Sequence, residues 1–405
     1  MNTLQKVSFL LLFLIKLSLP EIYAQDYSGS FYFEGKLRHY NVYLPQNFQA
    51  NMPVILNLHG YGTNWTIENH AKYTFMHDIA DTSGFIVVYP AGSVAPNGRP
   101  SWNNGLRDHP FGQTDTTSND VGFLLALIDT LYAHYDIDLN QVYCCGFSMG
   151  GEMTYRMAIE AGNRFAAFAS VSGKINDGSA GAGTPAGPYP ILHFHGTNDD
   201  VETYDGENDG NLWPVEETIG YWVDNNNCVY EADTVSIPNT DLTDGSTVQK
   251  ISYVNCSEDS RVIFFKILGG GHGWPGSTEG MYPNGNPNRD INASAEIVNF
   301  FKNNYLATSL QTKGRNINNE FALEQNYPNP FNPITTIEFT LPKSEYVELK
   351  IYDLLGKELS TLIAKKLNSG NHSYTFYGKN LASGIYYYHL LAGNYQEVKK
   401  MILLR

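Results

Sequence analysis

The chain has 405 residues, of which 42% are hydrophobic and 17% charged, as in ordinary globular proteins. This composition excludes a disordered, collagen-like or coiled-coil chain, and the length favours two or at most three domains. The formal net charge of −15 argues against nucleic acid bound through a basic surface and against docking on anionic lipid.

The first 24 residues have the features of a secretory signal. Lys6 supplies a positive start, residues 9–15 form a short apolar run that Lys16 interrupts, and Ala24 offers a small residue for cleavage. No other stretch approaches the ~20 apolar residues that span a bilayer. The sequence therefore predicts an exported mature chain without a membrane span.

Short apolar runs alternate with helical patterns up to about residue 306. Strands are predicted at residues 53–58, 85–89, 141–145, 191–194 and 262–267, and helices at residues 121–134, 152–161, 216–225 and 290–305. Asn119 or Asp120 is placed to cap the first of these helices. This alternation predicts an α/β domain, at residues 25–307, with a mainly parallel sheet.

The pattern changes after residue 307. Residues 308–321 are polar and are expected to form a linker, and residues 322–405 then alternate apolar and polar positions at 335–341, 346–352, 372–376, 384–391 and 397–404. Such runs predict a small antiparallel β-sandwich. The charge changes as well, from −18 over residues 25–321 to +2 over residues 322–405, which favours two domains with different roles.

Four cysteines are available to an exported chain: Cys144, Cys145, Cys228 and Cys256. Neighbouring Cα atoms lie ~3.8 Å apart, below the ~4.4 Å minimum for a bridge, so a Cys144–Cys145 bond is disfavoured. Cys228–Cys256 is the simplest pairing, and four free thiols are the alternative.

The motif with the clearest chemistry is Gly146-Phe-Ser-Met-Gly150. A strand is predicted before it and a helix after it, which is the setting of a nucleophile elbow. Residues flanking the serine must be small because the turn is tight. The pattern therefore predicts Ser148 as a nucleophile at a helix N-terminus, where developing negative charge is favoured.

A serine hydroxyl needs a base and an orienting acid, in the chain order serine, acid, histidine. Of the later histidines in this domain, only His272 follows a late strand, in a glycine-rich loop at residues 269–276. We therefore expect His272 to be the general base. Asp199 follows the strand at 191–194 and a glycine turn and is the expected acid, with Asp200 as the alternative.

An oxyanion hole needs two backbone donors. We expect one from Met149, which follows the nucleophile, and one from Tyr61 in the turn after the strand at 53–58, with Gly62 as the alternative. Trp102 and Trp274 are candidates to line the substrate groove, as is Trp213, and packing in the core is the competing interpretation.

Other patterns favour structural interpretations. His193 and His195 could bind a metal, but no third ligand has a clear spacing, so packing beside the acid is favoured and no metal is assigned. Residues 205–209 could bind calcium, but they lack the full loop pattern, which favours a solvated loop. Asn64 and Asn292 begin glycosylation triplets, which also arise by chance.

Residues 30–305 resemble the secreted α/β-hydrolase esterases of the polyhydroxybutyrate depolymerase-like group, which includes feruloyl and acetylxylan esterases. The resemblance rests on residues 35–40, 58–60, 120–124, 146–150, 195–199, 215–218 and 269–276. It implies an α/β-hydrolase fold, places the family's acid on Asp199, and places its paired cysteines on Cys228 and Cys256. Gly273 stands where relatives often carry Thr.

Residues 322–405 are similar to the C-terminal sorting domains of type IX secretion in the Bacteroidetes lineage. Residues 326–333, 349–357 and 381–388 carry the likeness. It implies passage to the periplasm, then export across the outer membrane by the type IX machinery, with cleavage expected in the region 308–320. The mature chain is expected outside the cell, either released or attached to its surface.

Together these features imply a secreted serine carboxylic-ester hydrolase that works through an acyl-enzyme and needs no cofactor. The expected substrate is a feruloyl or acetyl ester of plant polysaccharide. A polyester such as polyhydroxybutyrate is the alternative, because selectivity depends on loops at residues 92–118 and 201–215. A non-catalytic surface glycan binder is the alternative of another class, and the intact triad argues against it.

Overall fold

The computed structural model describes residues 25–62, 66–106, 114–207, 211–277, 285–304, 306, 321–323, 325–326, 329, 331–354, 356–367, 370–379 and 381–404. The predicted signal at 1–24 and the predicted linker, apart from residue 321, lie outside these residues. Within them, no helix has the length and apolar character needed to cross a membrane.

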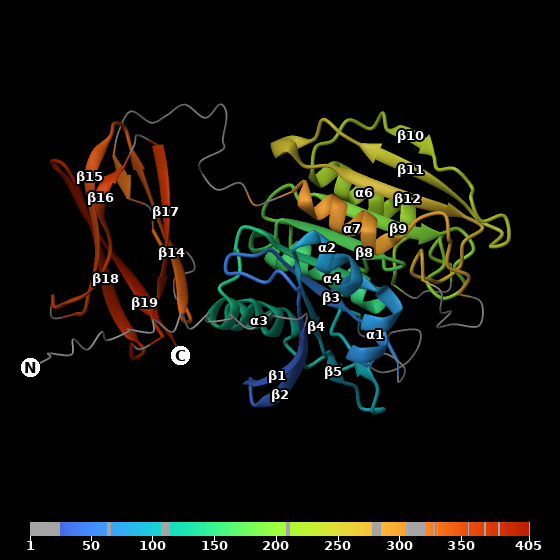
Figure 1. Ribbon diagram of the computed structural model, residues 1–405, viewed down its shortest axis with the longest axis horizontal. Helices are drawn as coiled ribbons and strands as arrows, with labels where there is room; N and C mark the ends of the chain where they lie inside the picture. The colour runs from blue at the N-terminus through green and yellow to red at the C-terminus, as the bar shows by residue number, and fades with distance from the viewer. Residues whose placement is uncertain are drawn as a thin grey trace, which may run out of the picture.

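One ten-stranded sheet organises the first domain (Figure 1). Its strands lie in the order β1 (Gln25–Phe33), β2 (Lys36–Leu44), β4 (Ile86–Pro90), β3 (Val54–Leu58), β7 (Val142–Phe147), β8 (Ala167–Val171), β9 (Ile191–Gly196), β12 (Val262–Leu268), β11 (Thr247–Tyr253) and β10 (Asp233–Ser236). The run from β4 to β12 is parallel. An antiparallel pair closes each edge, so the prediction of a mainly parallel α/β sheet is confirmed.

Helices cover both faces of this sheet, as parallel strands require. One face carries α3 (Asp120–Tyr135), α4 (Met149–Ala161) and α6 (Val215–Asn225), and the other carries α1 (Ile67–Thr74), α2 (Met76–Ser83) and α7 (Ala293–Lys302). Shorter elements are β5 (Ser93–Val94), β6 (Pro100–Ser101), α5 (Asp177–Ala180), and two 3-10 turns at Gly162–Arg164 and Ser257–Asp259. The central strands are buried along their whole length, which explains why they appear in the sequence as continuous apolar runs.

The predicted element boundaries need correction at two helices. α4 begins at Met149, three residues before the predicted start, because it grows directly out of the turn at Ser148 despite two glycines of low helix propensity. α7 is shorter than predicted and begins after Asn292, whose side chain accepts the Ala295 N–H as an N-cap. Asn119 caps α3 in the same way.

The second domain consists of two antiparallel sheets (Figure 1). One contains β13 (Ala322–Leu323), β14 (Ile334–Leu341) and β17 (Gly370–Tyr377), and the other contains β16 (Glu358–Leu367), β15 (Glu345–Tyr352), β18 (Gly384–Ala392) and β19 (Tyr395–Leu403). Side chains from both sheets, such as Phe339 and Tyr388, share one buried cluster. The predicted β-sandwich is therefore confirmed, with β13 and β16 added.

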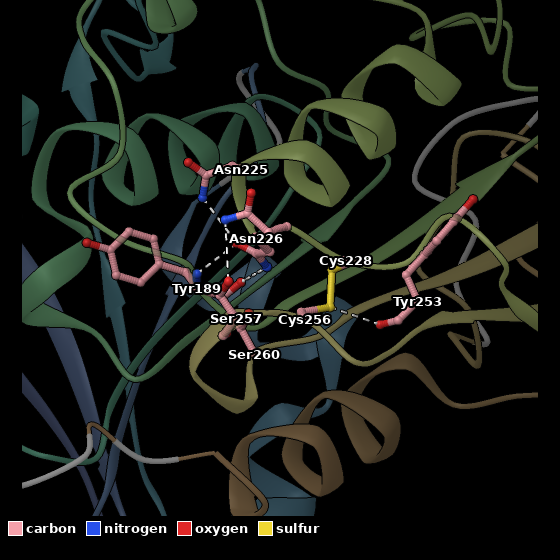
Figure 2. The surroundings of a disulfide bond; sticks show 9 residues. Tyr189, Asn225, Asn226, Cys228, Tyr253, Cys256, Ser257 and Ser260 are labelled. Carbon is pink, nitrogen blue, oxygen red and sulfur yellow. Dashed lines mark hydrogen bonds between the residues drawn. A yellow bond between two sulfur atoms is a disulfide. The ribbon is translucent and has the colours of Figure 1, made fainter. Parts of the chain in front are cut away.

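A disulfide joins Cys228, just after α6, to Cys256, just after β11 (Figure 2). Beside it, the Asn226 side chain accepts from the Tyr189 N–H and donates to the Tyr189 carbonyl, and the Ser257 N–H donates to the Asn226 carbonyl. The predicted pairing is confirmed, and the bridge fastens the end of α6 to the antiparallel edge of the sheet.

The other two cysteines are free and buried in β7. Their side chains enter different core clusters, Cys144 on the α4 face and Cys145 on the opposite face, because successive strand residues point to opposite sides. Burial raises the pKa of Cys144 to about 12 and that of Cys145 well above its usual value. Both thiols are therefore protonated and unreactive in the folded chain.

Candidate active site

Ser148 lies on the tight turn between β7 and α4. Its backbone has φ 54° and ψ −126°, a positive φ that a residue with a side chain rarely adopts. The Ser148 N–H donates to the Val171 carbonyl, and the Ser148 carbonyl accepts from the Glu152 N–H. The backbone is thus held in the strained conformation expected of a nucleophile elbow.

Two glycines of the motif are required by close backbone approach. A Cβ on Gly146 would lie 2.3 Å from the Gly150 carbonyl oxygen, and a Cβ on Gly150 would lie 2.2 Å from the carbonyl oxygen of Leu58. Neither obstacle can rotate away, because both belong to the backbone. The absence of these two side chains lets the nucleophile turn pack against the end of β3.

His272 and Asp199 form a buried hydrogen-bonded pair. The Nδ1 of His272 lies 2.8 Å from Oδ2 of Asp199, and Oδ1 of Asp199 accepts the backbone N–H groups of Val201 and Glu202. Burial alone would raise the pKa of Asp199, but His272, His195 and the Val201 amide hold it below its usual value. Asp199 is therefore an oriented carboxylate, whereas Asp200 is exposed.

Glycines bring the histidine loop to this carboxylate. Gly196 at the end of β9 passes so close to Gly270 that a Cβ on Gly196 would lie 2.2 Å from the Gly270 carbonyl oxygen. The Asn198 N–H donates to the same carbonyl. The His272 ring then lies 4.9 Å from the ring of Phe147, the residue before Ser148. The structure thus brings the predicted acid, base and nucleophile together at the carboxyl ends of the parallel strands. This arrangement is suited to acyl transfer.

The turn after β3 is held by His59. With Nδ1 donating to the Gly60 carbonyl and Nε2 accepting from the Gly92 N–H, the ring is neutral, and burial lowers its pKa to about 4. The Gly62 N–H donates to the Pro100 carbonyl, so Gly62 is engaged elsewhere. The remaining candidate donors are Tyr61 in this turn and Met149, whose N–H lies in the first turn of α4 and has no intrahelical acceptor.

The two tryptophans expected to line the groove are buried instead. Trp102 has no exposed surface, and its indole N–H donates to the His59 carbonyl while its backbone N–H meets the sulfur of Met149. Trp274 is 1% exposed, and its indole N–H donates to Ser294. In this structure both support the turns around the site and offer no surface to a substrate. Trp213 is partly exposed and donates to Asp177.

The other candidates from the sequence either have structural roles or lie outside the residues that the structure describes. His193 and His195 are stacked and buried beside the acid, and the described residues contain no group of three or more side chains arranged to hold a metal. The acidic segment 205–209 is described only in part, and Asn64 lies outside the described residues.

Two family models match the chain. Residues 33–247 match the family model described as "Putative esterase", and residues 325–404 match the model described as "Secretion system C-terminal sorting domain". The first match includes Ser148 and Asp199, and the second covers most of the β-sandwich.

Curated relatives are similar to the first domain. The bifunctional acetylxylan esterase/xylanase XynS20E of Neocallimastix patriciarum is 32% identical over 241 residues, which is 59% of this chain and 31% of that protein. Feruloyl esterase B of Piromyces equi is 28% identical over 247 residues, which is 57% of this chain and 42% of that protein. The chain thus spans less than half the length of these two relatives.

Among solved structures, an acetyl xylan esterase from Aspergillus awamori matches with 20% identity and a TM-score of 0.42, over 58% of this chain and 89% of that one. The esterase family model, by contrast, spans more than half of the present sequence and includes the nucleophile elbow. The chain belongs to this esterase family.

Proposed function

We propose that this chain is a secreted carboxylic-ester hydrolase that removes feruloyl or acetyl groups from plant polysaccharides. The observation that carries the proposal is the buried His272–Asp199 hydrogen bond beside the strand end that bears Ser148. The acetylxylan and feruloyl esterases among the relatives support the choice of acyl group.

The reaction follows from the roles of these three side chains. Ser148 Oγ attacks the ester carbonyl while His272 takes its proton, and the negative charge forms where Met149 and Tyr61 offer backbone N–H groups. His272 then protonates the leaving sugar hydroxyl, and an acyl-enzyme remains on Ser148. Water activated by His272 releases the free acid. Asp199 holds the imidazole orientation throughout and stays ionised, in line with its lowered pKa.

A polar cavity lies beside α4. Its volume is about 500 Å³, and its lining includes Asn103, Thr116 and Arg156. Arg156 lies on α4, eight residues and therefore about 12 Å along the helix from Ser148. We propose that the polysaccharide chain that carries the ester reaches this cavity when the ester lies at Ser148.

The β-sandwich supports export of the enzyme. We propose that it is the signal read by the type IX secretion machinery and that the chain between the two domains, at residues 308–321, is the region where it is removed. This assigns catalysis to residues 25–307 and transport to residues 322–405.

The test compares the full chain with its Ser148→Ala variant. Free ferulate and acetate are quantified after incubation with feruloylated, acetylated arabinoxylan, and a polyhydroxybutyrate suspension is followed in parallel. We expect acid release from the xylan, with kcat lower by on the order of 10⁶-fold in the variant.

Each other outcome contradicts a specific part of the proposal. Clearing of the polyester alone would overturn the substrate and leave the mechanism intact. Near-normal activity of Ser148→Ala would remove the nucleophile assignment. A wild-type chain that binds xylan but neither hydrolyses p-nitrophenyl acetate nor reacts with a fluorophosphonate would be a glycan binder.

A further inference from the structure

A row of buried polar rings leads from α4 to the carboxylate of Asp199. His193 and His195 lie on the same face of β9, and both are fully buried. Their rings stack with centroids 5.4 Å apart and planes 15° apart. Burying two imidazoles beside a charged pair is unfavourable unless their nitrogens are used, so their contacts indicate what they do.

The protonated nitrogen of His195 follows from its partner. Its Nε2 lies 2.8 Å from the backbone carbonyl oxygen of Glu202, and a carbonyl can only accept, so the hydrogen is on Nε2. Burial lowers the pKa of His195 to about 4, so the ring is neutral at pH 7. The same Nε2 lies 3.5 Å from Oδ2 of Asp199.

The Asp199 carboxylate is therefore surrounded by donors. Oδ2 lies 2.8 Å from Nδ1 of His272, which donates to it, and 3.5 Å from Nε2 of His195, whose N–H is donated to the Glu202 carbonyl. Oδ1 accepts from the amides of Val201 and Glu202. By binding the Glu202 carbonyl, His195 also closes the loop whose amides hold Oδ1. One imidazole thus acts on both oxygens of the carboxylate.

The His195 ring is held by His193 on the same strand and by Tyr204, and both of these neighbours lie in well-anchored surroundings. His193, which stacks on it, is hydrogen-bonded through Nδ1 to the hydroxyl of Tyr155 on α4 at 2.7 Å. Lys174, fully buried after β8, donates to the Thr203 carbonyl and anchors the next residue of the loop. The Tyr204 ring meets His195 edge-on at 6.1 Å.

We propose that His195 is a positioning residue for the acid of the triad, acting through its Nε2–H on the Glu202 carbonyl and on Oδ2 of Asp199. It does not touch the substrate. Its effect is to keep Oδ2 directed at His272, so that the base has the correct tautomer when Ser148 attacks. This inference rests on the proposed function, since it presupposes that Asp199 and His272 are the acid and base.

Two substitutions separate positioning from packing. His195→Gln keeps an N–H donor near the position of Nε2 but loses the ring, whereas His195→Phe keeps a ring to stack on His193 but has no donor. If His195 positions the acid, the Gln variant should be the more active. If it only fills space, the Phe variant should be the more active.

The measurement is kcat and KM for p-nitrophenyl acetate with the full chain, per folded molecule as judged by near-ultraviolet circular dichroism. We expect His195→Phe to lower kcat by about 10- to 100-fold, by analogy with the loss of a side chain that orients a metal ligand, with KM within about threefold. His195→Gln should stay within about tenfold of wild type. Phe194→Leu, an equally buried change on the opposite face of β9, is the control and should leave kcat within about threefold.

A Phe variant as active as wild type, or more active than the Gln variant, would overturn the inference. So would an equal loss of kcat in the Phe194 and His195 variants, because that would indicate general disruption of β9. Failure of the proposed function gives a different result, namely a wild-type chain that does not hydrolyse the ester at all.

Discussion

At the scale of single residues, the strained backbone of Ser148 should lower the stability of the fold, an effect that can be measured apart from catalysis. Alanine keeps the unfavourable positive φ at this position, whereas glycine adopts it without steric cost. We expect Ser148→Gly to be more stable than Ser148→Ala by about 1–3 kcal/mol, although both are inactive. Urea denaturation of the two full-length variants measures the difference.

The control is Ser170, a buried serine in the neighbouring strand β8 whose φ is not positive. Here the order should reverse, with Ala more stable than Gly, because glycine only adds unfolded-state entropy. The same order at both positions would contradict the view that Ser148 stores backbone strain.

At the scale of elements, the first turn of α4 and the turn after β3 are locked together through Gly150. A Cβ there would meet the carbonyl oxygens of Leu58 and His59 at 2.2 and 2.6 Å. We expect Gly150→Ala to cost about 1–3 kcal/mol of stability through overpacking. It should also lower kcat by at least about 100-fold, because it displaces the turn that carries the Tyr61 amide.

Gly220 provides the matched control within a helix. A Cβ on this residue of α6 meets no atom within 4 Å. Gly220→Ala should therefore be neutral or stabilise the fold by up to about 1 kcal/mol, with unchanged kcat. If Gly150→Ala behaves like Gly220→Ala in thermal melts and esterase assays, the two turns are not locked in this way.

The elements that could be predicted from the sequence are the buried strands, because their apolar residues follow one another without interruption. The runs in β3, β4 and β12 are rich in Val, Ile and Phe, and their strands were placed nearly to the residue. β8 could not be predicted because its sequence, AFASV, is short and three of its five residues are alanine or serine. β10 is exposed along its whole length and is formed by pairing with β11, a contact that local sequence does not encode.

Some residues of the candidate site could likewise be predicted from local sequence and others could not. Ser148, Asp199 and His272 could be predicted because each follows a strand with a glycine nearby, and the order of strands brings such ends together. The burial of Trp102 could not, since its indole bonds a carbonyl 43 positions away. The orientation of His195 toward Asp199 likewise depends on a contact between side chain and loop, the bond from its Nε2–H to the Glu202 carbonyl.

At the scale of the whole molecule, four buried neutral histidines make stability depend on pH. Burial lowers the pKa of His59 and His195 to about 4 and those of His70 and His193 well below 6.5. Below pH ~6.5 the unfolded chain binds a proton at each of these positions and the folded chain does not. The free energy of unfolding should therefore fall as pH falls from about 6.5 to 4, by up to about 5 kcal/mol per pH unit.

Urea denaturation of the full chain at pH 7, 6 and 5 tests this dependence. The midpoint should drop with each step, and His134→Gln, a change at an exposed position on α3, should leave the slope with pH unaltered. A midpoint that is constant between pH 7 and 5 would show that the buried rings do not control acid sensitivity.

The two thiols in the central strand β7 affect how the chain can be produced. In the folded chain they are buried on opposite faces of the sheet. In the reduced, unfolded chain, however, they compete with Cys228 and Cys256 for the same oxidant. The sheet must therefore assemble before oxidation is complete, or the chain is trapped in mispaired forms. Replacing both Cys144 and Cys145 by alanine leaves a single possible pairing, so oxidative refolding of that variant becomes insensitive to how fast the oxidant acts.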